Sequence, residues 1–106
     1  MNTAKRKRLE ENGWKVGSTT DFLKLSPEEE AYIEFKVAVS KALQELRKSK
    51  RLTQVDLAKR ISSSQSRVAK MEAADGSVTV DLMFRSMFAL GATNKKVVGM
   101  VESALP

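Results

Sequence analysis

The segment Leu52–Glu72, LTQVDLAKRISSSQSRVAKME, decides how this chain of 106 residues is interpreted. Apolar residues recur at helical spacing in each of its halves, and the serine run 62–64 separates the halves. These apolar positions are Leu57, Ala58 and Ile61 in the first half and Val68 and Met71 in the second. The segment therefore predicts two short helices with opposed apolar faces, joined by a tight turn.

The second of these predicted helices also carries a polar face. Its outward residues are Gln65, Ser66, Arg67 and Lys70. Amide, hydroxyl and cationic side chains are the types that reach base edges and phosphates in a groove of DNA. We therefore interpret the segment as a helix-turn-helix unit whose second helix binds DNA.

The net charge of +6 is concentrated on and just before this segment. Residues 40–70 carry nine basic and two acidic side chains, whereas residues 71–106 carry three basic and four acidic ones. Residues 1–24 carry six basic and three acidic side chains, and residues 25–39 carry one basic and four acidic. A local basic block indicates a polyanionic partner, with a lysine-rich solvated surface as the alternative. Its position beside the helix-turn-helix pattern favours nucleic acid.

The composition excludes several kinds of chemistry, because the chain contains no cysteine and no histidine. Disulfides, thiolate chemistry, imidazole bases and most zinc sites are thereby removed. No clustered carboxylates stand in a glycine-rich frame, so we expect neither an enzyme nor a cofactor. No apolar run is long enough to span a bilayer, and the basic N-terminus lacks the apolar core of a secretory signal. We therefore expect a cytoplasmic protein.

Ser26, Pro27 and Glu29 predict the start of a long helix. Serine at the N-cap, proline at the first helical position and glutamate at the third form a capping-box pattern. The helix is expected to end near Lys48 and to bury one apolar stripe. That stripe consists of Tyr32, Phe35, Val39, Ala42 or Leu43, and Leu46, widened by Ile33 and Val37. The acidic and aromatic start of this helix also leaves open contact with a basic partner protein.

Cap residues delimit the remaining helices. We expect Thr53 to cap a helix over 54–61, Ser64 to cap one over 65–73, Thr79 to cap one that Gly91 ends, and Asn94 to start the last helix.

The helix that Thr79 caps is predicted to be apolar nearly all round, which is more than one core face requires, and the last helix adds further apolar surface. The excess suggests a homodimer interface. The alternative is that an N-terminal arm containing Trp14 and Phe22 covers it. Within the arm, residues 18–25 predict a short helix or an edge strand.

These residues resemble the Cro/repressor-type helix-turn-helix family, often called the XRE family. The likeness covers about residues 39–91. It is carried by Thr53-Gln54, Leu57-Ala58, Ser64-Gln65-Ser66 and Met71-Glu72. It implies an all-α fold, namely a lambda repressor-like helix-turn-helix bundle of about five helices with an N-terminal arm. We accordingly divide the chain into an arm, 1–25, and a DNA-binding domain, 26–106.

The resemblance also implies an ion pair and a difference at the turn. The family often pairs an arginine at the end of its first helix with the glutamate that ends the recognition helix, here Arg47 with Glu72. A glutamate at a helix C-terminus is disfavoured without a nearby cation. The family usually has a glycine where this chain has Ser62-Ser63. Serine adopts the left-handed conformation only at a cost, so we expect the turn to differ in detail.

In this family's geometry the second helix of the unit lies in the major groove, and residues of both helices contact DNA. Gln65 is expected to bond adenine N6 and N7, and Gln54 to bond a phosphate. The complete set of expected DNA-binding residues is Lys50, Arg51, Thr53, Gln54, Ser64, Gln65, Ser66, Arg67 and Lys70. A homodimer would place two recognition helices roughly 34 Å apart on a near-palindromic operator in double-stranded DNA.

The whole layout, from the GWKVG-containing arm to the C-terminal helix, is similar to HigA-like antitoxins. Those proteins neutralise a partner ribonuclease toxin and repress their own operon. The likeness implies a repressor with a cognate toxin. Two alternatives stay open: a phage-type regulator without a toxin, and a helix-turn-helix fold used as a protein-bridging, coactivator-like module.

Overall fold

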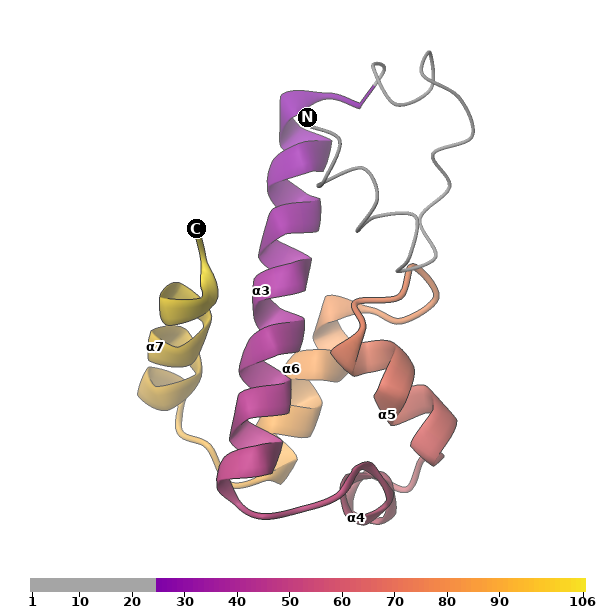
Figure 1. Ribbon diagram of the computed structural model, residues 1–106. Coiled ribbons are helices and arrows are strands. Elements are labelled where there is room, and N and C mark those ends of the chain that lie inside the picture. The colour runs from indigo at the N-terminus through magenta and orange to yellow at the C-terminus, as the bar shows by residue number, and fades with distance from the viewer. Residues whose placement is uncertain (1–24) are drawn as a thin grey trace.

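The computed structural model describes residues 25–106, which form a bundle of helices (Figure 1). Its elements are α3 (Pro27–Ser49), α4 (Gln54–Arg60), α5 (Gln65–Glu72), α6 (Val80–Ala89) and α7 (Asn94–Ala104). No strand occurs within residues 25–106, so the predicted all-α class is confirmed. None of these helices is long and apolar enough to cross a membrane. The predictions for Trp14, Phe22 and residues 18–24 lie outside the described residues.

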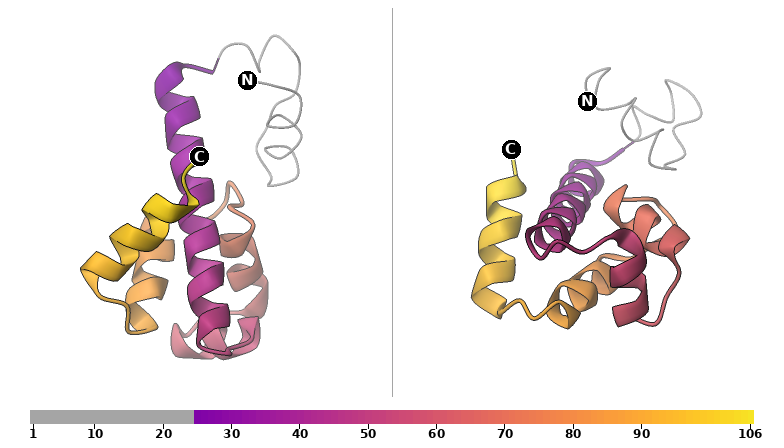
Figure 2. Two further views of the ribbon diagram at one scale, coloured as in Figure 1. Left: turned by 60° about the vertical axis from the view of Figure 1, so that its left-hand side comes forward. Right: turned by 60° about the horizontal axis from the view of Figure 1, so that its bottom comes forward.

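The long helix α3 organises the bundle. It contacts α5, α6 and α7, whereas α4 packs mainly on α5. The hairpin of α4 and α5 and the C-terminal helix α7 lie on opposite sides of α3 (Figures 1 and 2). The N-terminal part of α3 extends beyond the other four helices (Figure 1).

The core forms where these helices meet and draws side chains from all five. Its most deeply buried large members are Leu43 and Leu46 of α3, Leu57 of α4, Val68 and Met71 of α5, and Met83 and Met87 of α6. Each such side chain contributes about 1.5–3 kcal/mol by leaving water. Val97 and Val101 add the inner face of α7. The two predicted apolar faces of the hairpin are therefore confirmed, with Ile61 partly buried at the rim.

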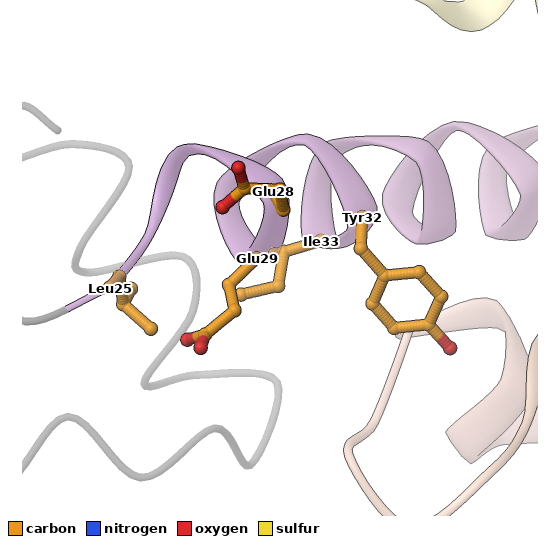
Figure 3. Close-up of a pocket in the computed structure, with 5 residues that line it drawn as sticks. All are labelled: Leu25, Glu28, Glu29, Tyr32 and Ile33. Atoms are coloured by element: carbon orange, nitrogen blue, oxygen red, sulfur yellow. The ribbon is translucent and has the colours of Figure 1, made fainter.

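Two aromatic residues of the predicted α3 stripe are not in the core. Tyr32 is 50% exposed and Phe35 is 36% exposed. Tyr32 lies near the start of α3 (Figure 3), and the ring of Phe35 meets that of Phe84 of α6 at 6.2 Å between centroids. Two polar residues, Lys36 and Ser40, lie on the buried face of α3 instead. The aromatic part of the predicted stripe was therefore wrong.

Every described helix begins at a hydroxyl N-cap. Ser26, Thr53, Ser64, Thr79 and Thr93 each accept a hydrogen bond from the backbone N–H three residues on. These bonds satisfy an N–H group that would otherwise have no partner within the helix.

At α4 both hydrogen bonds of a capping box are present, because the Asp56 carboxylate also accepts from the Thr53 backbone N–H at 2.9 Å. At α3 the serine half of the predicted box is present, with the Ser26 hydroxyl accepting from Glu29 N at 3.1 Å. The neighbouring carboxylate that interacts with Ser26 is that of Glu28. Hydrogen bonds from its own backbone and from the Ser26 hydroxyl lower the pKa of Glu28.

The turn between α4 and α5 keeps the left-handed residue that a glycine would supply. Ser62 has φ +54°. Its N–H bonds Lys59 O at 3.3 Å, and Ser63 N–H bonds Ala58 O at 2.8 Å, which together form a Schellman motif. A serine in this conformation costs about 1 kcal/mol relative to glycine. The departure from the family pattern therefore adds strain at Ser62 while the left-handed turn is retained.

Candidate nucleic-acid interface

Helix α5 has one buried and one exposed face. Val68 and Met71 are fully buried against the core, which fixes how the helix is rotated. Gln65, Ser66 and Arg67, together with Lys70 one turn later, are exposed on the outer side. The apolar side therefore anchors α5 while its polar start faces solvent.

The nine predicted DNA-binding residues fall into two neighbouring groups. Ser64, Gln65, Ser66, Arg67 and Lys70 belong to α5 and its cap, whereas Lys50, Arg51, Thr53 and Gln54 belong to the turn before α4 and its start. All are exposed except Gln54, which is half-buried. The groups meet where Gln65 Nε2 donates to Gln54 Oε1 at 2.6 Å.

A buried ion pair holds this region to α3. Arg47 Nε and Nη2 donate to the two carboxylate oxygens of Glu72 at 2.5 and 2.9 Å. The side chains of Arg47 and Glu72 are only 10% and 3% exposed. The hydrogen bond to Glu72 raises the pKa of Arg47, against the opposite effect of burial. The structure thus contains the ion pair that the family resemblance implied.

The same arginine also fixes the entry to α4. Its Nη1 donates to the backbone carbonyl of Leu52 at 2.7 Å. One guanidinium therefore joins the end of α3, the end of α5 and the turn that leads into α4. Because arginine presents its donors in a rigid planar fork, these three segments are held in one fixed relation.

Gln54 has partners that sequence reasoning missed. Its Nε2 donates to Glu72 Oε1 at 3.2 Å, while its Oε1 accepts from Gln65. The result is a chain of hydrogen bonds from Arg47 through Glu72 and Gln54 to Gln65. The sequence gives no local signal for it, because these residues are far apart in the sequence and only packing brings them together.

The Thr53 and Ser64 oxygens are already engaged in capping. Thr53 Oγ1 accepts from Asp56 N, and Ser64 Oγ accepts from Arg67 N, each at 3.1 Å. These two residues therefore shape the starts of α4 and α5, whose outward N–H groups and dipoles favour an anion such as phosphate.

The loop after α5 is also fixed to α3. The Asp75 carboxylate accepts from Ser77 N at 2.8 Å and from its hydroxyl at 2.6 Å, which lowers the pKa of Asp75. Lys36, only 2% exposed, donates from Nζ to the Asp75 carbonyl at 3.1 Å. Burial lowers the pKa of Lys36, and Asp75 opposes that shift. The sequence contains one indication that Lys36 is buried, namely its position three residues after Ile33, on the same helix face.

The all-α bundle that presents this hairpin is of the lambda repressor-like kind. A helix-turn-helix family model matches residues 43–85, from the middle of α3 into α6. The match supports an XRE-type helix-turn-helix and hence a DNA-binding transcription regulator. No curated protein and no solved structure matches the chain.

Proposed function

We propose that the protein is a sequence-specific repressor that places α5 in the major groove. The observation that carries this proposal is the exposed, polar start of α5, anchored through Gln54 to the buried pair of Arg47 and Glu72. A firmly held polar helix is what base recognition requires, because base contacts depend on a fixed approach to the groove. We assign this function to residues 26–106 and treat residues 1–25 as an appended arm.

Within this proposal the nine residues have two roles. Gln65 reads adenine, and Ser66, Arg67 and Lys70 reach neighbouring bases or phosphates. The caps at Thr53 and Ser64 aim the helix starts at the DNA backbone. Lys50, Arg51 and Gln54 complete the phosphate contacts, which supply affinity for any sequence.

Site selection from a random DNA library, followed by titration of variants, tests the proposal. Gln65→Ala should cost about 1–3 kcal/mol at one base position and relax the preference there. Lys50→Ala is the control, because loss of a phosphate contact weakens all sequences alike and reduces the salt dependence. Unchanged binding and unchanged preference for Gln65→Ala would exclude α5 as the reading helix.

We further propose that two copies pair through the side of the bundle that carries α6 and α7. Val98 is 64% exposed, and Leu105 and Phe88 are also exposed. Phe35 and Phe84 line an apolar cavity of about 220 Å³ beside Val98 and Leu105. Helix α7 lies across α3 from the hairpin, so pairing through it leaves α5 open to DNA (Figure 2). The expected binding site is accordingly near-palindromic.

Sedimentation of the full chain tests this pairing. Val98→Glu places a charge in the proposed interface and should shift the protein to monomer. Val55→Glu is the matched control, because Val55 is also exposed but lies on α4. A wild-type chain that sediments as a monomer at micromolar concentration contradicts the pairing without affecting the assignment of α5.

We also propose that the repressor is the antitoxin of a toxin–antitoxin pair. Support comes from the start of α3, where Glu28 and Glu29 border a cavity of about 410 Å³ with Leu25, Tyr32 and Ile33. Figure 3 shows Glu29 and Tyr32 projecting from the same side of α3. An acidic, partly apolar surface is complementary to a basic protein, and a small basic toxin fits that description.

Co-expression with the product of the neighbouring gene tests the antitoxin role. The expected result is a stable complex and relief of growth inhibition, both weakened by Tyr32→Arg and retained by Lys50→Ala. A neighbouring product that neither inhibits growth nor binds the chain would leave the phage-type regulator as the better description.

A further inference from the structure

The C-terminal end of α5 is tied by its own backbone to the loop that follows it. Ala74 has φ +53°, and its N–H bonds Met71 O at 3.2 Å. The next N–H, that of Asp75, bonds Lys70 O at 2.9 Å. These two bonds form a Schellman motif. Asp75 is therefore joined directly to α5, and a group that holds Asp75 also holds the helix.

Lys36 provides such a group from α3. Its Nζ donates to the Asp75 carbonyl oxygen at 3.1 Å, and its side chain is buried. Burial of an ammonium group costs free energy and lowers the pKa of Lys36, whereas the charge of Asp75 raises it. An apolar side chain of similar length would avoid this cost on the buried face of α3. Core stability alone therefore does not explain a lysine at this position.

Lys36 and Arg47 hold the end of α5 from two points of α3. They are 11 residues apart, or about three turns, so they lie on the same face and about 16 Å apart along the helix axis. Arg47 binds the Glu72 carboxylate, whereas Lys36 binds Asp75. Of these two cations only Arg47 lies within the segment that matches the helix-turn-helix family model. A single attachment allows a short helix to pivot, whereas two separated attachments fix its direction.

The direction of α5 matters more for base recognition than for phosphate contacts. Hydrogen bonds to base edges form only within a narrow range of distance and angle. Phosphates occur all along the duplex, and flexible lysine side chains reach them from many positions. A changed direction of α5 should therefore weaken binding to a selected sequence more than binding to other DNA.

We infer that Lys36 is a positioning residue whose ammonium group fixes the direction of α5 on α3 and thereby sets how strongly the protein prefers its operator over other DNA. The inference rests on the proposed function of α5. Because Lys36 is buried, it acts through Asp75 and the end of α5 rather than by touching DNA.

Lys36→Met tests this role, because methionine fills the site with an apolar chain and leaves the pair of Arg47 and Glu72 in place. Affinity is measured for the selected operator and for a duplex of unrelated sequence. Their ratio should fall about tenfold, which is the size of effect expected for one mismatched base pair. Lys41→Met is the matched control, since Lys41 is an exposed lysine of the same helix, and it should keep the ratio. Mere destabilisation would also keep it, because the folded fraction scales both affinities alike.

The absence of cysteine from the chain permits a chemical rescue at residue 36 alone. Lys36→Cys is alkylated in urea with 2-bromoethylamine and refolded, which restores an ammonium group at nearly the length of lysine. The same variant alkylated with iodoethane differs only in lacking that ammonium group. The aminoethyl form should recover the wild-type affinity ratio, and the ethyl form should not. Recovery by the ethyl form, or none by the aminoethyl form, overturns the inference.

Residual dipolar couplings of the free protein report the direction of α5 without DNA. The backbone N–H couplings of α5 relative to α3 should change in Lys36→Met and stay as in the wild type in Lys41→Met. Unchanged couplings in Lys36→Met overturn the inference, and so does an unchanged affinity ratio. A wild-type chain that selects no DNA sequence contradicts the proposed function instead, and the couplings then still decide whether Lys36 orients α5.

Discussion

The hairpin and the last two helices carry opposite kinds of surface. On the side of the hairpin, α5 buries its apolar residues and exposes amide, hydroxyl and cationic groups. In the part of the chain that forms α6 and α7, Phe88, Val98 and Leu105 are exposed. A polar, basic surface gains its affinity from phosphates, whereas an apolar one gains it from leaving water. The contrast indicates that one small bundle offers separate surfaces to DNA and to protein.

Among substitutions that probe the two surfaces, replacement of the buried Arg47 beneath the hairpin should have the largest effect on stability. Arg47→Ala leaves the Glu72 carboxylate buried and unpaired, and should lower the free energy of unfolding by about 3 kcal/mol. The control lies on α6, where Arg85 pairs with Asp81 at 2.8 Å but both side chains are more than 70% exposed. Arg85→Ala should cost at most about 0.5 kcal/mol. Urea denaturation measures the free energy of unfolding of both variants. Equal decreases would contradict the prediction that the buried ion pair contributes more than the exposed one.

The next effect concerns the left-handed residues that end α4 and α6. Ser62→Gly should stabilise the protein by about 1 kcal/mol, because glycine adopts positive φ without strain. Gly91, at φ +88°, is the matched position, and a Cβ there would meet no atom within 4 Å. Gly91→Ala should therefore destabilise by a similar amount through backbone strain alone. Thermal unfolding of both variants checks the pair, and opposite signs are the expected result.

The smallest effect separates two helix caps by their response to acid. Hydrogen bonds from the Thr53 backbone N–H and hydroxyl lower the pKa of Asp56 on folding. A carboxyl group whose pKa is lowered stabilises the fold above its unfolded pKa and loses that contribution as pH falls through the folded pKa. The cap of α7 provides the comparison, since Thr93 accepts from Lys96 N and no acidic residue lies in the first turn.

Amide proton NMR during an acid titration tests this difference. The first turn of α4 should loosen as Asp56 takes up a proton, while the first turn of α7 should not respond at the same pH. Asp56→Asn should remove the pH response at α4. A first turn of α4 that titrates like that of α7 would show that the Asp56 bond does not stabilise the cap.

The predictions from sequence succeeded where the signal was local. Ser26, Thr53, Ser64 and Thr79 each begin a helix as expected, because a hydroxyl at the N-cap satisfies an N–H two or three residues away. The apolar faces around Leu57 and Met71 are confirmed for the same reason, since helical spacing alone places them on one side.

Features that depend on distant segments were beyond sequence reasoning. Helical spacing assigned Tyr32 and Phe35 to a buried stripe, but how far the neighbouring helices reach along α3 decides how much of that stripe they cover. The bond from Lys36 to Asp75 joins residues that the helix pattern treats as unrelated. Each depends on which surfaces meet in three dimensions, and apolar periodicity does not encode that.

Local sequence patterns predict the hairpin, its caps and the residue types on the outer face of α5, because these features follow from neighbours within a turn or two of helix. Its likeness to a known family added the pairing of Arg47 with Glu72. The position of Gln54 between Glu72 and Gln65, in contrast, follows from the packing of the helices. The physical reason is that a hydrogen bond needs its two atoms within about 3 Å, and only the packing of α3, α4 and α5 brings these side chains so close.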